Sequence, residues 1–247
     1  MRLRFSQGRL PASLSVVTLY NDNFSELLST GASLNALTHQ WVVVNGGYNN
    51  HEQKLKDLGF HDFIYLPGPD SGIYNGFNRG IKSCTGEFVW FLNAGDISVI
   101  QSDAILLSQA LSKARDLVIF RLYNLETRRH SRRFLIPRLW LKFGISPLPH
   151  QAIWFNRKAI QKIGEFNETI GLIADQEYIY RALCSGRQCF VNKVIAVFEG
   201  HGRGSKLQAD SFQLRMQNIT FIQDSFGLVI VRNLIQFARN VRRKLRV

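Results

Sequence analysis

Two aspartates stand where the sequence pattern predicts the end of a structural element. Asp96 closes the segment Phe-Leu-Asn-Ala-Gly-Asp, whose first residues belong to a continuous apolar run over residues 88–92. Such a run predicts a strand buried on both faces, so we expect Asp96 to meet solvent at the carboxyl end of that strand. Ligands of open α/β sheets bind beyond this end, which makes Asp96 a candidate contact for a metal or ligand. A turn-forming Asp after Gly is the alternative.

Asp175 lies in the segment Ile-Ala-Asp-Gln-Glu-Tyr, at the start of a helix predicted over residues 175–184. A carboxylate placed in this way can act as a general base that takes a proton from a hydroxyl group. The alternative is a purely local role, because an acid in the first turn of a helix is favoured by capping and by the helix dipole. Glu177 is a second possible base, but its offset of two residues turns it toward another face of the helix.

The elements that must position these aspartates alternate along the chain. Apolar runs predict strands over residues 14–20, 41–44, 63–66, 88–92, 117–122 and 189–198. Helical patterns cover residues 23–37, 51–58, 72–83, 102–113, 157–163 and 175–184. This alternation predicts an α/β fold with a mostly parallel central sheet and helices on both faces. The first strand is not followed by Gly-x-Gly-x-x-Gly, which argues against a dehydrogenase.

Several motifs, in matching order and spacing, resemble the family 2 glycosyltransferases, especially small enzymes of bacterial surface polysaccharide and colanic-acid type. The resemblance covers about residues 13–205. The motifs are Leu-Ser-Val-Val-Thr-Leu-Tyr-Asn from residue 14, Trp-Val-Val-Val-Asn-Gly-Gly from residue 41, Pro-Asp-Ser-Gly-Ile-Tyr-Asn-Gly-Phe-Asn-Arg-Gly-Ile from residue 69, the segment ending at Asp96, His-Gln-Ala-Ile-Trp-Phe from residue 150, and the segment around Asp175.

The resemblance implies a GT-A type fold, Rossmann-like, and an inverting glycosyltransferase. Such an enzyme would transfer a sugar from a nucleotide sugar to a lipid-linked or polysaccharide acceptor in surface polysaccharide biosynthesis. Asp175 matches the family's catalytic base. Asp96 matches the metal-binding acid, which implies a divalent cation, Mg²⁺ or Mn²⁺. A metal or cationic groups would neutralise the charge that develops on the departing nucleoside diphosphate.

The resemblance also assigns further residues to the two sides of the pocket. The positions implied for the donor side are Thr18, Asn21, Asn45, Asp70, Asn78, Asn93 and Asp96. His150 and Gln151 match a family strand near the acceptor, although a lone His is more often structural. His201 and Arg203, in the glycine-rich run over residues 200–205, are candidates for contacting the donor diphosphate, with a plain surface turn as the alternative.

Three amides stand where the family more often carries acids. Asn45 takes the place of an Asp that contacts the nucleotide base, Asn75 replaces an Asp of the helix motif, and Asn93 replaces the first acid of the metal motif. An amide of this size keeps hydrogen-bonding geometry but removes the negative charge. A catalytically weak relative that only binds a nucleotide sugar is therefore an alternative function.

Length and composition are consistent with one catalytic domain. The 247 residues are 45% hydrophobic, which is enough for a full core, and we assign residues 1–225 to the glycosyltransferase domain. We find neither a secretory signal nor an apolar run of about 18 residues, so we expect a cytoplasmic protein or one on the inner face of the cell membrane. Cys84, Cys184 and Cys189 form no Cys-x-x-Cys pair and are expected to be buried reduced thiols.

The formal net charge of +13 comes mainly from two segments. Residues 121–142 hold seven Lys or Arg and one acid, and residues 226–247 hold six and no acid. The second segment has the pattern of a basic amphipathic helix, which favours contact with an anionic membrane over simple packing on the domain. Arginines interleaved with aromatic residues in the first segment suit lipid or acceptor phosphates. They would also suit nucleic acid, but we expect no nucleic-acid partner because no such motif is present.

Overall fold

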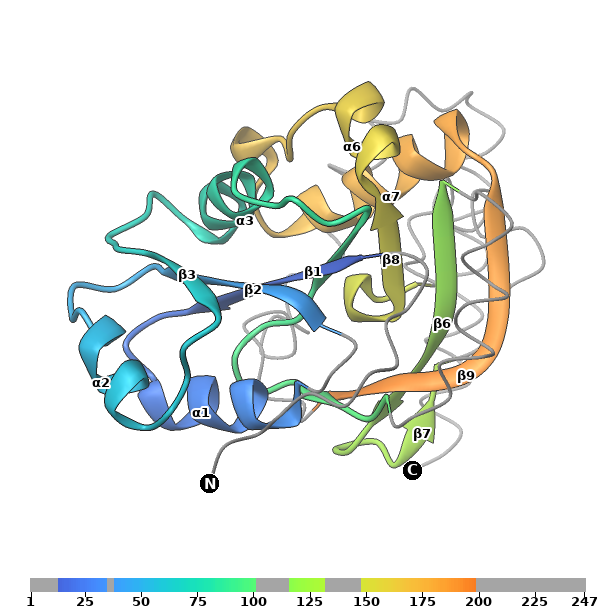
Figure 1. Ribbon diagram of the computed structural model, residues 1–247. Coiled ribbons are helices and arrows are strands. Elements are labelled where there is room, and N and C mark those ends of the chain that lie inside the picture. Colours follow the sequence, from blue (N-terminus) through green and yellow to red (C-terminus); the bar gives the residue numbers. More distant parts are fainter. Residues whose placement is uncertain (1–12, 35–37, 101–115, 132–147, 199–247) are drawn as a thin grey trace, which may run out of the picture.

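The computed structural model describes residues 13–34, 38–100, 116–131 and 148–198 (Figure 1). Three of the sequence predictions lie outside these residues. They are the helix over residues 102–113, the basic helix over residues 226–247, and the phosphate-loop candidates His201 and Arg203.

The described residues form one mixed sheet with the strand order β3-β2-β1-β4-β8-β6-β9-β5, and β7 pairs with β6 outside this path. The strands are β1 (Leu14–Tyr20), β2 (Thr38–Asn45), β3 (Phe63–Leu66), β4 (Phe88–Phe91), β5 (Ile97–Ser98), β6 (Leu117–Asn124), β7 (Arg129–His130), β8 (Ile153–Asn156) and β9 (Gln188–Phe198). Strands β1, β2, β3 and β4 are parallel, and β8 then reverses direction between β4 and β6. Strand β9 is parallel to β6, whereas β5 and β7 run antiparallel to their neighbours. The sheet is therefore mostly parallel, as predicted.

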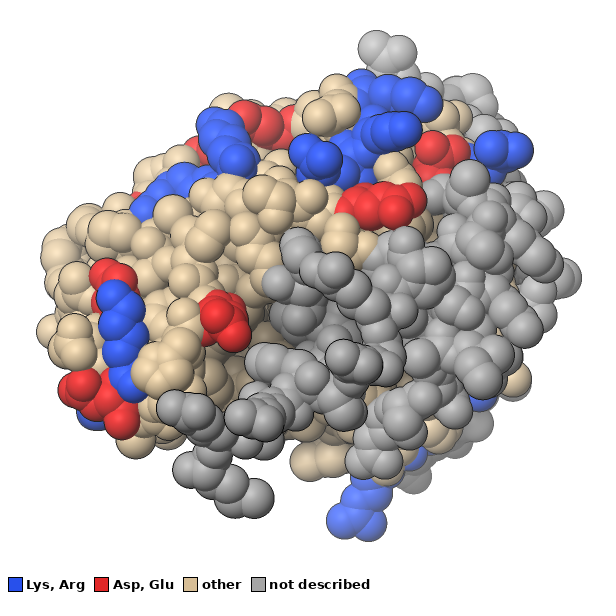
Figure 2. Space-filling model, viewed as in Figure 1, with Lys and Arg blue, Asp and Glu red and all other residues tan. Residues whose placement is uncertain are grey.

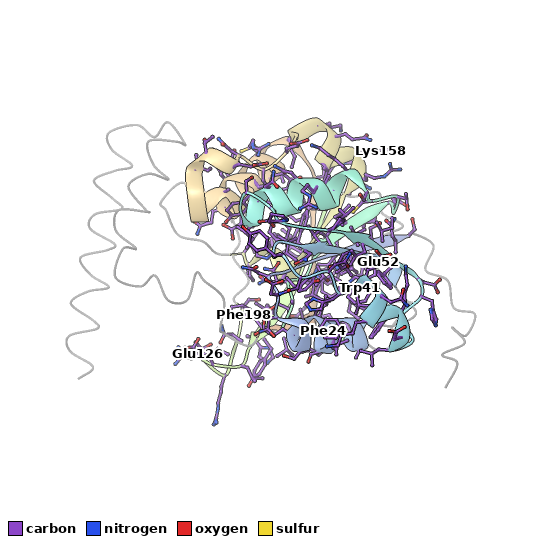
Figure 3. All side chains as sticks on the ribbon, turned by 90° about the vertical axis from the view of Figure 1, so that its left-hand side faces the viewer. Phe24, Trp41, Glu52, Glu126, Lys158 and Phe198 are labelled. Atoms are coloured by element: carbon purple, nitrogen blue, oxygen red, sulfur yellow. The ribbon has the colours of Figure 1, made fainter. Side chains whose placement is uncertain are left out.

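Helices cover both faces of this sheet. They are α1 (Phe24–Ser33), α2 (Glu52–Asp57), α3 (Ile73–Lys82), α6 (Arg157–Ile163) and α7 (Ala174–Ser185), with 3-10 turns η1 (His150–Ala152) and η2 (Glu168–Ile173). Figure 1 shows α3, α6 and α7 on one side of the sheet and α1 and α2 on the other. Figure 3 shows the same arrangement from another direction, with Lys158 of α6 and Phe24 of α1 on opposite sides.

The sheet separates two hydrophobic cores. Strand β1 is buried at all seven positions, and its side chains alternate between the two faces because successive residues of a strand point in opposite directions. Val16 belongs to the core beneath α1 and α2, and Val17 to the core beneath α3, α6 and α7. Gly80 of α3 allows close packing on the sheet, since a Cβ there would lie 2.4 Å from Val17 Cγ1.

The sequence predicted most elements to within two residues, and the largest departures are at the His-Gln-Ala segment and at the end of α1. The His-Gln-Ala segment is not a strand, because residues 150–152 form one 3-10 turn and β8 begins at Ile153. Helix α1 ends at Ser33, and Leu34 is already extended with a ψ angle of 127°. Of the cysteines, Cys84 is buried as expected but Cys184 is exposed.

The parallel strands β1, β2, β3 and β4 place their carboxyl ends at one edge of the sheet. Asn21 follows β1, Asn45 ends β2, Asp70 follows β3 and Asn93 follows β4, so all four residues lie at that edge. Ligands of α/β sheets bind in this position. The fold therefore places the donor-side candidates around one common region.

Candidate functional site

The turn after β4 carries the candidate metal acid. The backbone N–H of Asp96 donates to the carbonyl of Asn93 at 3.0 Å, and the Asp96 Oδ2 atom accepts from the backbone N–H of Asn93 at 3.1 Å. Gly95 between them has a φ angle of 93°, in the left-handed region that favours glycine. Asp96 is only 3% exposed, so the expectation that it meets solvent was wrong. The Asp96 carboxylate instead accepts a hydrogen bond from within the turn to which it belongs.

Thr30 of α1 supports this turn from below. Its hydroxyl donates to the carbonyl of Asp96 at 2.9 Å and accepts from the backbone N–H of Gly95 at 3.0 Å. The Thr30 side chain is fully buried. Sequence analysis did not single out this residue. The available signal was a threonine on the otherwise apolar inner face of a predicted helix, where a polar group needs a partner.

Asp175 lies in the first turn of α7, as predicted, with a side chain that is 24% exposed. Its Oδ1 atom accepts from the backbone N–H of Gln176 at 2.8 Å, and its Oδ2 atom lies 3.5 Å from Nδ1 of His150. Burial and the neighbouring Asp175 carboxylate raise the pKa of Tyr74 above its ordinary value. Asp175 is therefore a partly accessible carboxylate among buried groups, an environment that suits a general base.

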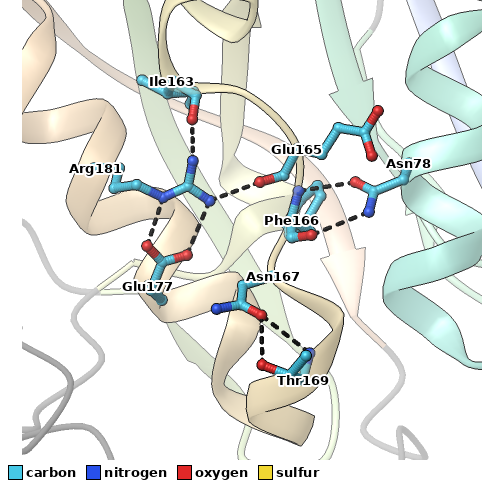
Figure 4. A network of polar contacts seen from close by, with 8 residues as sticks. All are labelled: Asn78, Ile163, Glu165, Phe166, Asn167, Thr169, Glu177 and Arg181. Atoms are coloured by element: carbon cyan, nitrogen blue, oxygen red, sulfur yellow. Dashed lines mark hydrogen bonds and ion pairs between the residues drawn. The ribbon is translucent and has the colours of Figure 1, made fainter.

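Glu177 has a different environment (Figure 4). Its two carboxylate oxygens accept from Arg181, with Oε1 2.5 Å from Nε and Oε2 2.9 Å from Nη2. Arg181 in turn donates to the backbone carbonyls of Ile163 and Glu165. The bidentate pair lies within α7, and the contacts of Arg181 with the two carbonyls tie α7 to the end of α6 and to the loop that follows it. Glu177 is therefore engaged in structure, which favours Asp175 as the base.

His150 connects the two halves of the site. Its Nδ1 atom faces Asp175, and its Nε2 atom lies 3.5 Å from Nδ2 of Asn93. The short turn η1 brings it there, between the reversing strand β8 and the end of β4. Gln151, the other acceptor-side candidate, is buried, and its carbonyl accepts from Nε1 of Trp90 at 2.8 Å.

A second group of donor-side candidates surrounds the loop after β2. The Asn45 side chain donates to the carbonyl of Asn49 at 2.8 Å and accepts from the backbone N–H of Gly47 at 2.9 Å. Asp70 accepts from the backbone N–H of Gly72 at 3.0 Å, and its carboxylate lies against Gly46. A Cβ at Gly46 would lie 2.7 Å from Asp70 Oδ2, so this approach requires glycine.

Asp22 completes this loop cluster, although sequence analysis did not select it. Its carboxylate oxygens accept from the backbone N–H groups of Tyr48 and Asn49, at 3.4 and 3.0 Å. The hydrogen bond from Asn49 is the main cause of a lowered pKa for the Asp22 carboxyl group. The loops after β1 and β2 are therefore joined by a charged acceptor. A run of polar residues after the end of β1, residues 21–23, was the signal that could have found it.

Two other candidates use their polar groups inside the protein. Thr18 is fully buried and accepts from Nε1 of Trp41 at 3.0 Å. The Asn78 amide donates to the carbonyl of Phe166 at 3.0 Å and accepts from its backbone N–H at 2.8 Å (Figure 4). Asn21, by contrast, is exposed. The structure thus brings Asn93, Asp96, His150 and Asp175 together, while Thr18 and Asn78 hold elements in place.

The described residues at the carboxyl edge of the sheet offer too few ligands to hold a metal ion alone. They suit a cation whose other ligands are supplied by a bound substrate. No group of three or more His, Cys, Asp or Glu side chains in the described part of the chain could hold a metal ion. The turn after β4 offers the Asp96 carboxylate and Oδ1 of Asn93, a buried oxygen that has no hydrogen-bond partner among the described residues. Mg²⁺ is commonly held by one or two carboxylates together with substrate phosphates, and such a cation matches these two oxygens.

The comparisons with known proteins bear on this arrangement. No protein-family model matches the chain. An uncharacterised glycosyltransferase of Mycobacterium tuberculosis is 27% identical over 206 residues, which cover 78% of this chain and 77% of that protein. A PGL/p-HBAD biosynthesis glycosyltransferase of Mycobacterium bovis is 28% identical over 208 residues, which cover 77% of each chain.

Solved structures agree on the fold. The mannosyltransferase PcManGT of Pyrobaculum calidifontis, in complex with GDP-Man and Mn²⁺, matches with a TM-score of 0.64 and 13% identity, over 92% of this chain and 70% of that one. Residues 1–349 of S. aureus TarS in complex with UDP match with a TM-score of 0.61 and 14% identity, over 84% of this chain. The match spans 64% of that TarS chain.

The chain is a glycosyltransferase with the GT-A fold. The resemblance found in the sequence motifs is thereby confirmed at the level of fold and enzyme class. The nucleic-acid-binding alternative receives no support from these relatives. In the described part of this glycosyltransferase, none of the helices combines the length and apolarity that a membrane span requires.

Proposed function

We propose that this glycosyltransferase belongs to family 2 and transfers a sugar from a nucleotide sugar to a lipid-linked or polysaccharide acceptor, with inversion at the anomeric carbon. One observation carries the proposal. The partly exposed Asp175 carboxylate lies at the start of α7, 3.5 Å from His150, whose other nitrogen faces the turn after β4. A single base thus stands opposite the donor edge, and direct displacement requires only one base.

In this reaction, Asp175 takes the proton of the acceptor hydroxyl as that oxygen attacks the anomeric carbon of the donor. The bond between the anomeric carbon and the diphosphate oxygen breaks, and the nucleoside diphosphate leaves with the electron pair. The loops after β1, β2 and β3, held by Asp22, Asn45 and Asp70, bind the nucleotide part. A divalent cation, Mg²⁺ or Mn²⁺, held by Asp96 and Asn93, would neutralise charge on the leaving diphosphate.

The location of the acceptor fits the charge of the chain. The basic segment over residues 226–247 holds six Lys or Arg and no acid, which favours peripheral contact with an anionic membrane on its cytoplasmic face. A lipid-linked acceptor would be available there. Similarity to relatives in PGL/p-HBAD biosynthesis is consistent with an acceptor of glycolipid type.

The test is sugar transfer measured by mass spectrometry, with UDP and GDP sugars screened first by thermal stabilisation. We expect Asp175→Asn to lose transfer by about 10² to 10⁴-fold while its affinity for the donor stays close to that of wild type. Glu165→Gln is the matched control, because Glu165 is an exposed carboxylate of the loop before α7 and pairs with Lys82. Full turnover in Asp175→Asn would refute the role of Asp175 as the general base. Donor binding without turnover in the wild type would favour the catalytically weak relative.

A further inference from the structure

One imidazole lies between the donor-side turn and the candidate base. His150 comes from η1, Asn93 from the turn after β4, and Asp175 from the first turn of α7, so three segments distant in sequence meet at this ring. The His150 side chain is only 13% exposed. The ring of Phe77 on α3 meets it edge-on, with the ring centroids 5.6 Å apart. The imidazole is therefore held in a defined orientation.

The two nitrogens of His150 have different partners, and this determines the favoured tautomer. Nδ1 faces the Asp175 carboxylate, which can only accept a hydrogen bond when ionised, so Nδ1 carries the proton. Nε2 then has a lone pair, and the Asn93 amide N–H points toward it at 3.5 Å. Both contacts are long, as is common for catalytic groups before a substrate draws the site together.

The amide at position 93 suits the imidazole in the tautomer with the proton on Nδ1. In the arrangement described, Asn93 donates toward Nε2 and its Oδ1 atom is buried without a partner among the described residues. An aspartate at this position could only accept, and it would favour the charged ring alone. The contact with His150 therefore gives a structural reason for an amide rather than an acid at position 93.

We propose that His150 is a positioning residue, which orients the Asp175 carboxylate through its Nδ1–H group and is itself oriented by the amide of Asn93. This inference rests on the proposed function, because it gives Asp175 the role of base. His150 does not touch the reacting atoms. Oδ1 of Asp175 is held by the backbone N–H of Gln176 at 2.8 Å, and the Nδ1–H group of His150 faces Oδ2 at 3.5 Å, so the imidazole fixes the carboxylate from its second side.

Two amide substitutions at position 150 distinguish the roles of the two ring nitrogens of His150. Asn places its side-chain N–H near the position of Nδ1, whereas Gln reaches only the position of Nε2. We expect His150→Asn to keep kcat within about threefold of wild type, and His150→Gln and His150→Ala to lose about 10²-fold, the cost of a base misplaced by about 1 Å. The KM for the donor should stay unchanged in all three variants. His61→Asn is the matched control, because His61 is exposed.

A loss of kcat in His150→Asn as large as in His150→Ala would overturn the proposal, as would full activity in His150→Ala. Unchanged donor affinity in each variant shows that it is folded. A ¹⁵N NMR measurement of the ring supplies a readout without turnover. We expect the Nδ1–H tautomer in the wild type and its loss in Asp175→Ala. An Nε2–H tautomer in the wild type would refute the positioning role even if transfer is observed, whereas absent transfer with the Nδ1–H tautomer would refute the proposed function alone.

Discussion

At the scale of single residues, the site depends on buried polar groups that the sequence alone did not reveal. Asp96 was predicted from its place after a strand, and the turn alternative describes its contacts well, because its carboxylate caps Asn93. Thr30 was not predicted, since a threonine within a helix has no pattern that specifies a distant partner. Its contacts with Gly95 and Asp96 bridge more than 60 residues of sequence, and only the fold creates them.

Thr30 provides a direct test of this support. Thr30→Val keeps the shape of the side chain but removes the hydroxyl, so the carbonyl of Asp96 loses the hydrogen bond from Thr30, and the N–H of Gly95 keeps only its longer bond of 3.3 Å to the carbonyl of Glu26. We expect the free energy of unfolding to fall by about 1 to 3 kcal/mol. Urea unfolding measures this change, and nucleotide-sugar affinity should fall with it. Ser29→Ala is the matched control on the same helix, because Ser29 is exposed and bonds only within α1. Equal effects of both substitutions would contradict the role of Thr30.

At the scale of elements, the sequence predicted strands and helices well but not the contacts that join them. Runs such as residues 14–20 and 157–163 have the predicted bounds, because buried strands and capped helices carry local patterns. The strand β8 was expected to begin at His150, and the 3-10 turn that replaces its start has no comparable pattern. That turn places the His150 side chain between Asn93 and Asp175, so that each of its ring nitrogens faces one of them. The pairing order β4-β8-β6 likewise requires contacts distant in sequence.

The junction between α3 and η2 accounts for another amide in the sequence. Asn75 of α3 donates to the Glu168 carboxylate of η2, with Nδ2 3.2 Å from Oε2, and Asn78 donates to the same carboxylate at 2.8 Å. This contact joins the helix of the donor-side motif to the segment that leads into α7 (Figure 1). An acid at position 75 would face another acid. Asn75 is thus a structural partner of Glu168.

The substitution Asn75→Asp tests this interpretation. It restores the acid of the family pattern but places a second negative charge beside Glu168. Because the pair is exposed, we expect a loss of only about 0.5 kcal/mol in the free energy of unfolding, and added salt should reduce it. The double variant Asn75→Asp with Glu168→Gln removes the repulsion and should recover most of the loss. A cost that persists in the double variant would show that the charge of Glu168 is not the cause.

At the scale of the whole molecule, positive charge is the feature through which we expect the enzyme to contact a membrane. The basic segment over residues 121–142, of which the structure describes residues 121–131, is one candidate for membrane contact, and two further basic regions compete with it. One is the segment over residues 226–247, which lies outside the described residues. The other is the surface over α3 and α6, where Figure 2 shows Lys and Arg side chains together with acids. Lys82 there already pairs with Glu165 at 2.9 Å, so part of that charge is balanced within the protein.

We therefore expect the C-terminal segment to dominate membrane binding. Replacing Arg239, Arg242, Arg243 and Lys244 with Gln removes four charges, each of which contributes about 1 kcal/mol near an anionic surface. The partition coefficient for phosphatidylglycerol vesicles should then fall by about 10² to 10³-fold, measured by co-sedimentation at low salt.

The matched control replaces four exposed basic residues over α3 and α6 with Gln, namely Lys82, Arg157, Lys158 and Lys162. This control removes the same charge from the protein but leaves the C-terminal segment intact. If net charge alone drew the enzyme to lipid, the two quadruple variants would lose binding equally. A larger loss in the control would place the membrane at α3 and α6, whereas a loss confined to the C-terminal variant would assign it to residues 226–247. Deleting those residues should then move the enzyme from the membrane fraction to the soluble fraction of a cell lysate.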